Sequence, residues 1–263
     1  MTVDASRITV LMYHRVGATG NDWERRYGIT PEGFAAHMRH LRNLGMQAVS
    51  LADFLAWLDG QCPLPEGSFL LTFDDGYRGV HDHAAPVLLE LGWPAVVFLV
   101  SDLLGASDDW CRAENPDRRA HALMGPTEIR DLQGQGFSFQ SHTRTHPDLT
   151  RLDDDRLAAE LSGSRLALQE LLDTEVTCLA YPYGRQDARV VEAARNAGYS
   201  HGFSTQPGFN RRSVMPLLIR RLDITGTDTP RMLERKIRYG SNDGSLRQQL
   251  RYYRERLIQR FLP

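Results

Sequence analysis

Two neighbouring aspartates, Asp74 and Asp75, close an apolar run that covers residues 69–73. Ionised carboxylates are costly to bury unless a cation balances their charge. His142 and His146 follow later in the chain, and their spacing lets both imidazoles reach one point. A strand that ends in two carboxylates, together with this histidine pair, predicts a metal-dependent hydrolase.

The predicted metal ligands are Asp75, His142 and His146, a set that leaves open positions for water and substrate. Zinc is the default metal for such a hydrolytic site, and cobalt, nickel or iron would also fit these ligands. Pro147 disfavours an α conformation at His146, so we expect the histidine pair on a tight loop. Taken alone, the pair would more often be two unrelated surface residues, and the two aspartates in the same chain favour the metal.

Three further residues could carry the hydrolysis. Asp74 is the expected general base, because a carboxylate beside the metal can take a proton from water. His14 is the expected general acid, since its reference pKa of about 6.5 lets it donate a proton at neutral pH. The amide of Tyr183 could donate to a developing oxyanion. Each residue also has a plain structural interpretation, as a turn former, a cap on the first strand and an ordinary turn, respectively.

Short apolar segments place these residues at the ends of strands. The expected strands cover residues 8–13, 69–73, 95–100, 137–140, 176–181, 201–204 and 217–222. Several are apolar throughout, as parallel strands covered on both faces are. His14, Asp74, His142 and Pro182 each fall just after one of these strands. Because sites in parallel α/β folds lie at the carboxyl ends of strands, the four positions predict one site on one face.

Helix-like segments alternate with these strands and predict an α/β architecture. The expected helices cover residues 30–45, 81–91, 153–172 and 188–197. The first starts with Thr30 as a side-chain cap and Pro31 at the first helical position. Residues 101–124 are polar and irregular, so we expect a long loop there, either in contact with substrate or as an ordinary surface excursion.

The bulk composition fits one globular domain over residues 1–263. The chain is 41% hydrophobic and 24% charged. Its first residues show no basic segment followed by an apolar one, and no stretch approaches the roughly 20 apolar residues that cross a bilayer. Three cysteines, Cys62, Cys111 and Cys178, are far apart, which fits a reducing compartment. We therefore expect a cytoplasmic protein.

The charge is unevenly placed. Residues 206–263 hold 13 basic and 5 acidic residues, against 18 basic and 28 acidic residues before them. We expect residues 244–262 to form a basic amphipathic helix. Packing against the rest of the fold is the favoured interpretation, and contact with the anionic inner face of the membrane stays open. No nucleic-acid binding is predicted, because the basic residues lack interleaved aromatic residues on a known fold.

Three segments resemble, in order, the signature motifs of the polysaccharide deacetylases, the NodB-homology group of carbohydrate esterases. They are Thr-Phe-Asp-Asp-Gly at 72–76, His-Thr-Arg-Thr-His-Pro at 142–147 and Tyr-Pro-Tyr-Gly at 181–184. The resemblance runs from about Ile8 to Thr205, and its first two motifs are highly specific. It implies a distorted (β/α) barrel that uses a divalent metal to remove N-acetyl groups from amino sugars.

The same resemblance implies roles for individual residues. Asp74 would be the base, the amide of Tyr183 would hold the oxyanion, and the metal ligands would be the three named above. We expect Tyr77, Trp110 and Pro182 to contact the saccharide. A lipid-linked or nucleotide-linked N-acetyl sugar would be anionic and would suit both a cytoplasmic location and the basic tail.

Two departures from the family pattern stand out. Many members carry an arginine that orients the catalytic aspartate where this chain has Ala180. Many also carry a Leu-x-His acid motif near the C-terminal end, and none follows His201. His14 would replace that acid, as in the poly-N-acetylglucosamine deacetylase branch, which this chain resembles most.

Other functions stay open from sequence. One is a metal-dependent amidase or deformylase that acts on a non-sugar amide. An iron(II) oxygenase also uses two histidines and a carboxylate, but such sites usually sit on an all-β scaffold, which this sequence does not predict. A saccharide-binding homologue with weakened catalysis is the third, and Ala180 is the feature that keeps it open.

Overall fold

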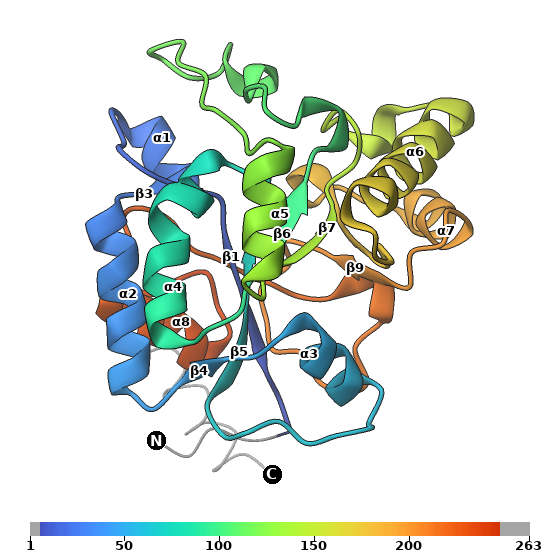
Figure 1. The fold of residues 1–263 in the computed structure, drawn as a ribbon. Coiled ribbons are helices and arrows are strands. Elements are labelled where there is room, and N and C mark those ends of the chain that lie inside the picture. The colour runs from blue at the N-terminus through green and yellow to red at the C-terminus, as the bar shows by residue number, and fades with distance from the viewer. Residues whose placement is uncertain (1–5, 248–263) are drawn as a thin grey trace.

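The computed structural model describes residues 6–247, in which eight parallel strands form the central sheet (Figure 1). The strand order is β10-β1-β5-β6-β7-β8-β9, with β4 beside β5. The strands are β1 Thr9–Tyr13, β4 Gln47–Ala48, β5 Ser68–Phe73, β6 Val96–Leu99, β7 Ser138–Ser141, β8 Cys178–Ala180, β9 His201–Phe203 and β10 Leu222–Asp223. A small separate pair joins β2 Arg15–Val16 to β3 Gly28–Ile29.

One segment joins the two edges of the sheet. Ile219 pairs in parallel with Phe203 of β9, and three residues later Leu222 pairs with Leu11 of β1. The sheet therefore curves round into a distorted (β/α) barrel, which confirms the fold that the family resemblance implies.

Helices cover the outside of this barrel (Figure 1). They are α1 Asp22–Tyr27, α2 Pro31–Asn43, α3 Leu51–Leu58, α4 Ala85–Leu91, α5 Pro126–Gly134, α6 Asp154–Leu172, α7 Ala188–Asn196 and α8 Pro230–Tyr239. Thr30 caps α2 by accepting from the Gly33 amide, and Asp153 caps α6 in the same way. The four helices expected from sequence are present, while α1, α3, α5 and α8 were not expected.

Two hydrophobic cores follow from the period-2 alternation of the strands. Leu11, Leu71 and Val97 belong to the larger core, which includes the inner faces of the helices. Their neighbours in sequence belong to a second core inside the barrel, which contains Val10, Leu70, Val96, Phe98, Ala180, Phe203 and Ile219. Phe54 and Trp57 of α3 are part of this inner core, so α3 closes the barrel at the end opposite the carboxyl ends of the strands (Figure 1).

Two elements of the structure differ from those predicted from sequence. The strand expected over residues 217–222 is instead a 3₁₀ turn at Pro216–Leu218, a single pairing at Ile219 and the short β10. The expected helix over residues 81–91 begins as a π-helical turn, Val80–Ala84, because Pro86 near the start of α4 cannot donate a backbone hydrogen bond.

The remaining expectations concern the loop and the tail. Residues 101–124 contain two short 3₁₀ turns, Ser101–Leu103 and Asp109–Cys111, and isolated bridge residues but no longer element, so the predicted long loop is confirmed. The basic helix expected over residues 244–262 lies, from residue 248 on, outside the described residues. Within residues 6–247, no helix is both long and apolar enough to span a bilayer.

Candidate active site

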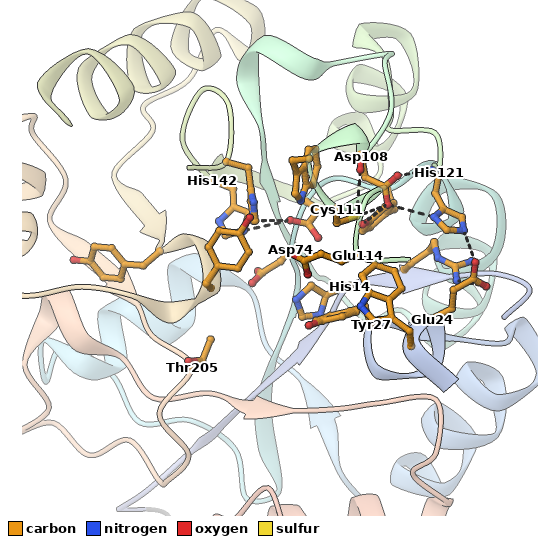
Figure 2. Close-up of a pocket in the computed structure, with 18 residues that line it drawn as sticks. His14, Glu24, Tyr27, Asp74, Asp108, Cys111, Glu114, His121, His142 and Thr205 are labelled. Carbon is orange, nitrogen blue, oxygen red and sulfur yellow. Dashed lines mark hydrogen bonds and ion pairs between the residues drawn. The ribbon is translucent and has the colours of Figure 1, made fainter. Parts of the chain in front are cut away.

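The carboxyl ends of β1, β5 and β7 bring the predicted site residues to one place (Figure 2). The Asp74 amide donates to the Tyr13 carbonyl at 2.9 Å, which fixes the aspartate pair beside the end of β1. The His142 amide donates to the Leu99 carbonyl at 2.8 Å at the end of β6. Asp74 and Asp75 are 2% and 6% exposed, so both carboxylates are buried.

The loop that carries the histidine pair is held from α6. Glu160 accepts hydrogen bonds from the backbone amides of Arg144 and Thr145 at 2.8 and 3.1 Å. Asp75 and His146 have positive φ angles of 69° and 62°, which non-glycine residues rarely adopt. Such backbone strain is typical of functional sites, where the surrounding contacts enforce it. The tight loop predicted from Pro147 is therefore present.

Asp75, His142 and His146 form a compact group. One carboxylate oxygen of Asp75, Oδ1, lies 3.4 Å from His142 Nε2 and 3.3 Å from His146 Nε2. All three ligand atoms lie within 4.8 Å of one another, and Asp75 Oδ1 is buried with no hydrogen-bond partner. His142 Nδ1 donates to the Ala180 carbonyl at 2.8 Å, which leaves its Nε2 facing the group. A divalent cation fits these three donors.

The electrostatics of the group also favour a cation. Burial alone would raise the pKa of Asp75, but His142 and His146 outweigh burial and hold it below its usual value. Burial lowers the pKa of His146 to about 4, so this imidazole is neutral at physiological pH, as a metal ligand must be. Burial also acts to lower the pKa of His142, but Asp75 and Asp74 outweigh it and raise the pKa. The space between the three side chains thus favours positive charge.

Asp74 forms a two-armed ion pair with Arg221. Arg221 Nη1 and Nη2 donate to Asp74 Oδ1 and Oδ2 at 2.6 and 2.8 Å. The Arg221 side chain is fully buried inside the barrel, and its Nε donates to the Ser204 carbonyl at 3.0 Å. Burial alone would raise the pKa of Asp74, but Arg221 outweighs it and holds the pKa at about 2. Asp74 is therefore ionised and fixed in orientation.

Arg221 pairs with the aspartate that a family arginine at the position of Ala180 would orient. We expected the arginine that orients the aspartate to be missing, because Ala180 occupies its family position. In the structure, Arg221 approaches Asp74 from the segment before β10, and its guanidinium lies 5.6 Å from the Phe98 ring in the same inner core as Ala180. Arg221 was not among the site residues predicted from sequence, although an arginine at the end of an apolar segment, directly before Leu222, could have pointed to it.

His14 lies between β1 and β2 and faces the same cavity as Asp74 and His142 (Figure 2). Its imidazole packs edge-on against the Tyr27 ring, with 5.8 Å between ring centres. Asp223 of β10, which pairs with Met12 of β1, is a second residue that sequence analysis missed. Burial raises the pKa of Asp223, and the nearby His14 partly offsets that effect. Asp223 and His14 thus lie within electrostatic range of each other.

Tyr183 lies in a tight turn after β8. Its φ and ψ angles are 59° and 5°, and the turn is closed by the amides of Gly184 and Arg185, which donate to Tyr181 and Pro182. Neither bond uses the Tyr183 amide. The Tyr183 ring is 49% exposed and packs edge-on against His146, whereas Pro182 is buried and the cavity wall here consists of Tyr181 and Tyr183.

Gly184 controls this turn, and its replacement by alanine is our first prediction. Its φ is +66°, and an added Cβ would lie 1.9 Å from Thr205 Oγ1. We expect Gly184→Ala to lower the free energy of unfolding by about 1–3 kcal/mol and to reduce kcat, because the turn must move. Urea unfolding and initial rates would measure both effects.

The matched control is Gly134→Ala in α5, where an added Cβ meets no atom within 4 Å. We expect that change to leave kcat unaltered and to raise the free energy of unfolding by up to about 1 kcal/mol. Unchanged stability in Gly184→Ala would contradict the assigned geometry of the turn.

The cavity around these residues has about 680 Å³ of empty space, part of it open to solvent. Trp110, from the 101–124 loop, stacks on His146 with 4.7 Å between ring centres. Tyr77 also lines the cavity, where its hydroxyl donates to Asp108 at 2.8 Å. Trp23 and Tyr27 add aromatic surface from α1. The cavity therefore offers aromatic faces around a carboxylate–histidine centre, a combination that suits a sugar ring.

Comparison with known proteins agrees with this geometry. Residues 62–202 match the model of the polysaccharide deacetylase family. The chain belongs to this family. It is 27% identical over 207 residues to Bacillus subtilis (strain 168) YxkH, whose name describes a polysaccharide deacetylase; the match covers 79% of this chain and 67% of YxkH. It is 24% identical over 216 residues to the poly-β-1,6-N-acetyl-D-glucosamine N-deacetylase of Staphylococcus epidermidis, covering 74% and 71% of the two chains.

Solved structures show the same fold. The Streptococcus pyogenes deacetylase PplD, solved in complex with acetate, superimposes with a TM-score of 0.75 at 21% identity and covers 92% of this chain and 100% of its own. IcaB from Ammonifex degensii gives a TM-score of 0.74 at 24% identity, with 89% and 98% covered. The polysaccharide deacetylase fold thus extends well beyond the matched motifs, to most of the described chain.

Proposed function

We propose that this polysaccharide deacetylase is a metal-dependent hydrolase that removes the N-acetyl group from an amino sugar within a saccharide. One observation carries the proposal: the buried group of Asp75, His142 and His146 shares a cavity with Asp74, which Arg221 orients, and with His14. Zinc is the proposed metal, because two histidines and one carboxylate are its usual hydrolytic ligands.

A divalent cation bound by Asp75, His142 and His146 would polarise the acetamide carbonyl and make water more acidic. Different residues of the protein then carry out the individual proton transfers. Asp74 is ionised and aligned, so it accepts the proton of the attacking water. The Tyr183 amide donates a hydrogen bond to the oxygen on which negative charge develops.

His14 completes the reaction. It lies at the end of β1, and a carboxylate, Asp223, lies within electrostatic range of its ring. Because His14 lines the cavity beside Asp74 and is not one of the three ligands, it donates a proton to the departing nitrogen, which leaves as a free amine while acetate is released. Trp110 stacks on His146 and Tyr183 packs edge-on against it, and the two rings keep bulk water away from that imidazole.

A substrate panel tests the class of amide that is hydrolysed. We expect the metal-loaded protein to release acetate from N-acetylglucosamine oligomers, with one new primary amine for each acetate, and to leave N-acetylated and N-formylated amino acids intact. Faster hydrolysis of the amino acid amides than of any sugar would assign this cavity to a non-sugar amidase instead.

Metal binding gives a second prediction, and it does not depend on turnover. A metal that binds only the folded state stabilises it by about 2.7 kcal/mol at a free concentration of 100 times its Kd. We expect zinc to raise the Tm of the wild-type protein and to have little effect on His142→Ala, which lacks one of three ligands.

The control for the metal experiment is His40→Ala, a change on the outer helix α2. We expect zinc to stabilise this variant as much as the wild type. Equal stabilisation of His142→Ala and the wild type would rule out the proposed ligand group. Differential scanning fluorimetry with and without chelator would measure all three proteins.

A further inference from the structure

A second depression, an open groove, lies beside the catalytic cavity and shares two wall residues with it, Arg15 and His121. The groove runs between the 101–124 loop and the segment around α1. Asn21 links the two segments by hydrogen bonds. Its Nδ2 donates to Asn115 Oδ1 at 3.1 Å and to Asp117 Oδ2 at 2.9 Å. The groove therefore lies where hydrogen bonds hold two segments of the chain together.

A buried polar network fixes this junction to the catalytic end of the barrel (Figure 2). Glu24 is 1% exposed and accepts from Asn115 Nδ2 at 3.1 Å. The His121 ring lies between two carboxylates, 3.5 Å from Glu24 Oε1 and 3.2 Å from Asp108 Oδ2. Asp108 in turn accepts from the Tyr77 hydroxyl, just after the aspartate pair. This network therefore fixes the position of the groove relative to the catalytic cavity.

Arginine dominates the charge of the groove. Its ionised wall residues are Arg15, Arg112, Arg118, Arg119 and Asp109. Arg112 Nη1 lies 3.5 Å from Asp109, and Arg119 Nη2 lies 3.8 Å from Asp117, both longer than a direct charge-assisted hydrogen bond. Arg144, on another face, meets its carboxylate at 2.7 Å. Arg112 Nε donates to the Arg118 carbonyl at 3.0 Å, and Arg118 Nη1 donates to the Ala113 carbonyl at 2.9 Å. Within the described residues, the groove therefore presents guanidinium groups that are held partly by backbone carbonyls and only loosely by carboxylates.

Arg15 adds a buried donor to this wall. It is 8% exposed, and its Nη1 donates to the Ala18 carbonyl at 2.6 Å. Its Nη2 lies 3.5 Å from Glu24 Oε2 and is buried without a hydrogen bond. A buried donor that lacks an acceptor costs free energy, and an oxyanion in the groove would supply acceptors to the guanidinium groups around it.

We propose that this groove binds an anionic group, a phosphate or a carboxylate, of the same saccharide whose N-acetyl group enters the catalytic cavity. The inference rests on the proposed deacetylase function and narrows its substrate to an anionic glycan or glycan precursor. The planar guanidinium fork matches either oxyanion in two-armed geometry. A neutral N-acetylglucosamine chain would leave the groove unused.

The test compares three disaccharides of equal length with the metal-loaded protein. They are neutral N,N′-diacetylchitobiose (called chitobiose below), the 1-phosphate of the same N-acetylated disaccharide, and the carboxylate-bearing disaccharide of N-acetylglucosamine and N-acetylmuramic acid. KM and kcat for acetate release are measured for the wild type and for the double variant Arg112→Gln/Arg119→Gln, whose two side chains are more than half exposed. Arg195→Gln on α7, whose arginine pairs with Glu192, is the control for loss of surface charge.

We expect one anionic disaccharide to have a lower KM than chitobiose in the wild type, and the one preferred identifies phosphate or carboxylate. The double variant should raise that KM about tenfold, the effect of losing charge-assisted hydrogen bonds, while the KM for chitobiose stays unchanged. Arg195→Gln should resemble the wild type. Equal KM values for the three disaccharides in the wild type, or the same change for all three in the double variant, would overturn the inference but leave the deacetylase function standing.

If no disaccharide is hydrolysed, the proposed function fails and the groove is tested by binding alone. Calorimetric titration of chitobiose 1-phosphate and of the carboxylate disaccharide into the wild type and the double variant then decides. Affinity for either one that weakens about tenfold in the double variant supports the anion site, and affinity for neither, or affinity equal in both proteins, overturns it.

Discussion

Asp74→Asn is expected to lower kcat by roughly 10²- to 10⁴-fold, the usual contribution of a positioned proton acceptor. Asparagine keeps the size of the side chain but cannot accept the proton of the attacking water. KM should change little, because the ligand group of Asp75, His142 and His146 does not include Asp74. Steady-state kinetics on an N-acetylglucosamine oligomer would measure both constants.

Two controls make the Asp74 result interpretable. Metal content and zinc-induced stabilisation should match the wild type, which shows that the ligand group is intact. Asp148→Asn, a change to an aspartate that pairs with Arg185 outside the cavity wall, should retain full turnover. Turnover within a factor of about two of the wild type in Asp74→Asn would refute its role as the base.

Arg221→Met is expected to reduce both stability and turnover. The side chain is fully buried and holds Asp74 with two hydrogen bonds, so its removal leaves a buried carboxylate without its charge partner. Breaking such a pair costs about 3–5 kcal/mol of stability. The pKa of Asp74, now held at about 2, should rise because burial is no longer offset by the guanidinium.

A double-mutant cycle separates positioning from a merely structural role. Asp74→Asn/Arg221→Met should be more stable than the sum of the single changes predicts, because neither charge is then left unpaired. Arg221→Lys keeps the charge but not the two-armed geometry, so we expect it to recover more stability than kcat. Arg220→Gln, a change to the exposed neighbour, should behave as wild type. Full turnover in a folded Arg221→Met protein would show that Asp74 needs no orienting partner.

Local pattern predicted the part of the site that lies at strand ends. Asp74, Asp75, His14 and His142 each come just after a strand of the parallel sheet, and the position of a strand end depends mainly on local sequence. The pairing of β1 with β5 then places His14 beside Asp74. The (β/α) barrel and the family could be predicted from these motifs and their order.

The partners of these residues could not be predicted, because they depend on long-range contacts. Arg221 is 147 residues from Asp74 in sequence, and it reaches the barrel interior only because the expected strand over 217–222 is interrupted. His121, which lies between Glu24 and Asp108, joins the 101–124 loop to α1, and these two segments share no sequence pattern. Ala180 showed that this chain lacks an arginine at the family position. It gave no information about Arg221, whose side chain lies inside the same barrel.

The central claim is that the cavity hydrolyses the N-acetyl group of a saccharide with a bound divalent cation and Asp74. Acetate release from an N-acetylglucosamine oligomer tests it most directly, with the wild type measured after zinc loading, after chelation and after zinc is restored. We expect release by the zinc-loaded protein, loss on chelation, recovery with zinc, and loss in zinc-loaded Asp74→Asn. Release that persists after chelation, or equal release by Asp74→Asn, would contradict the account.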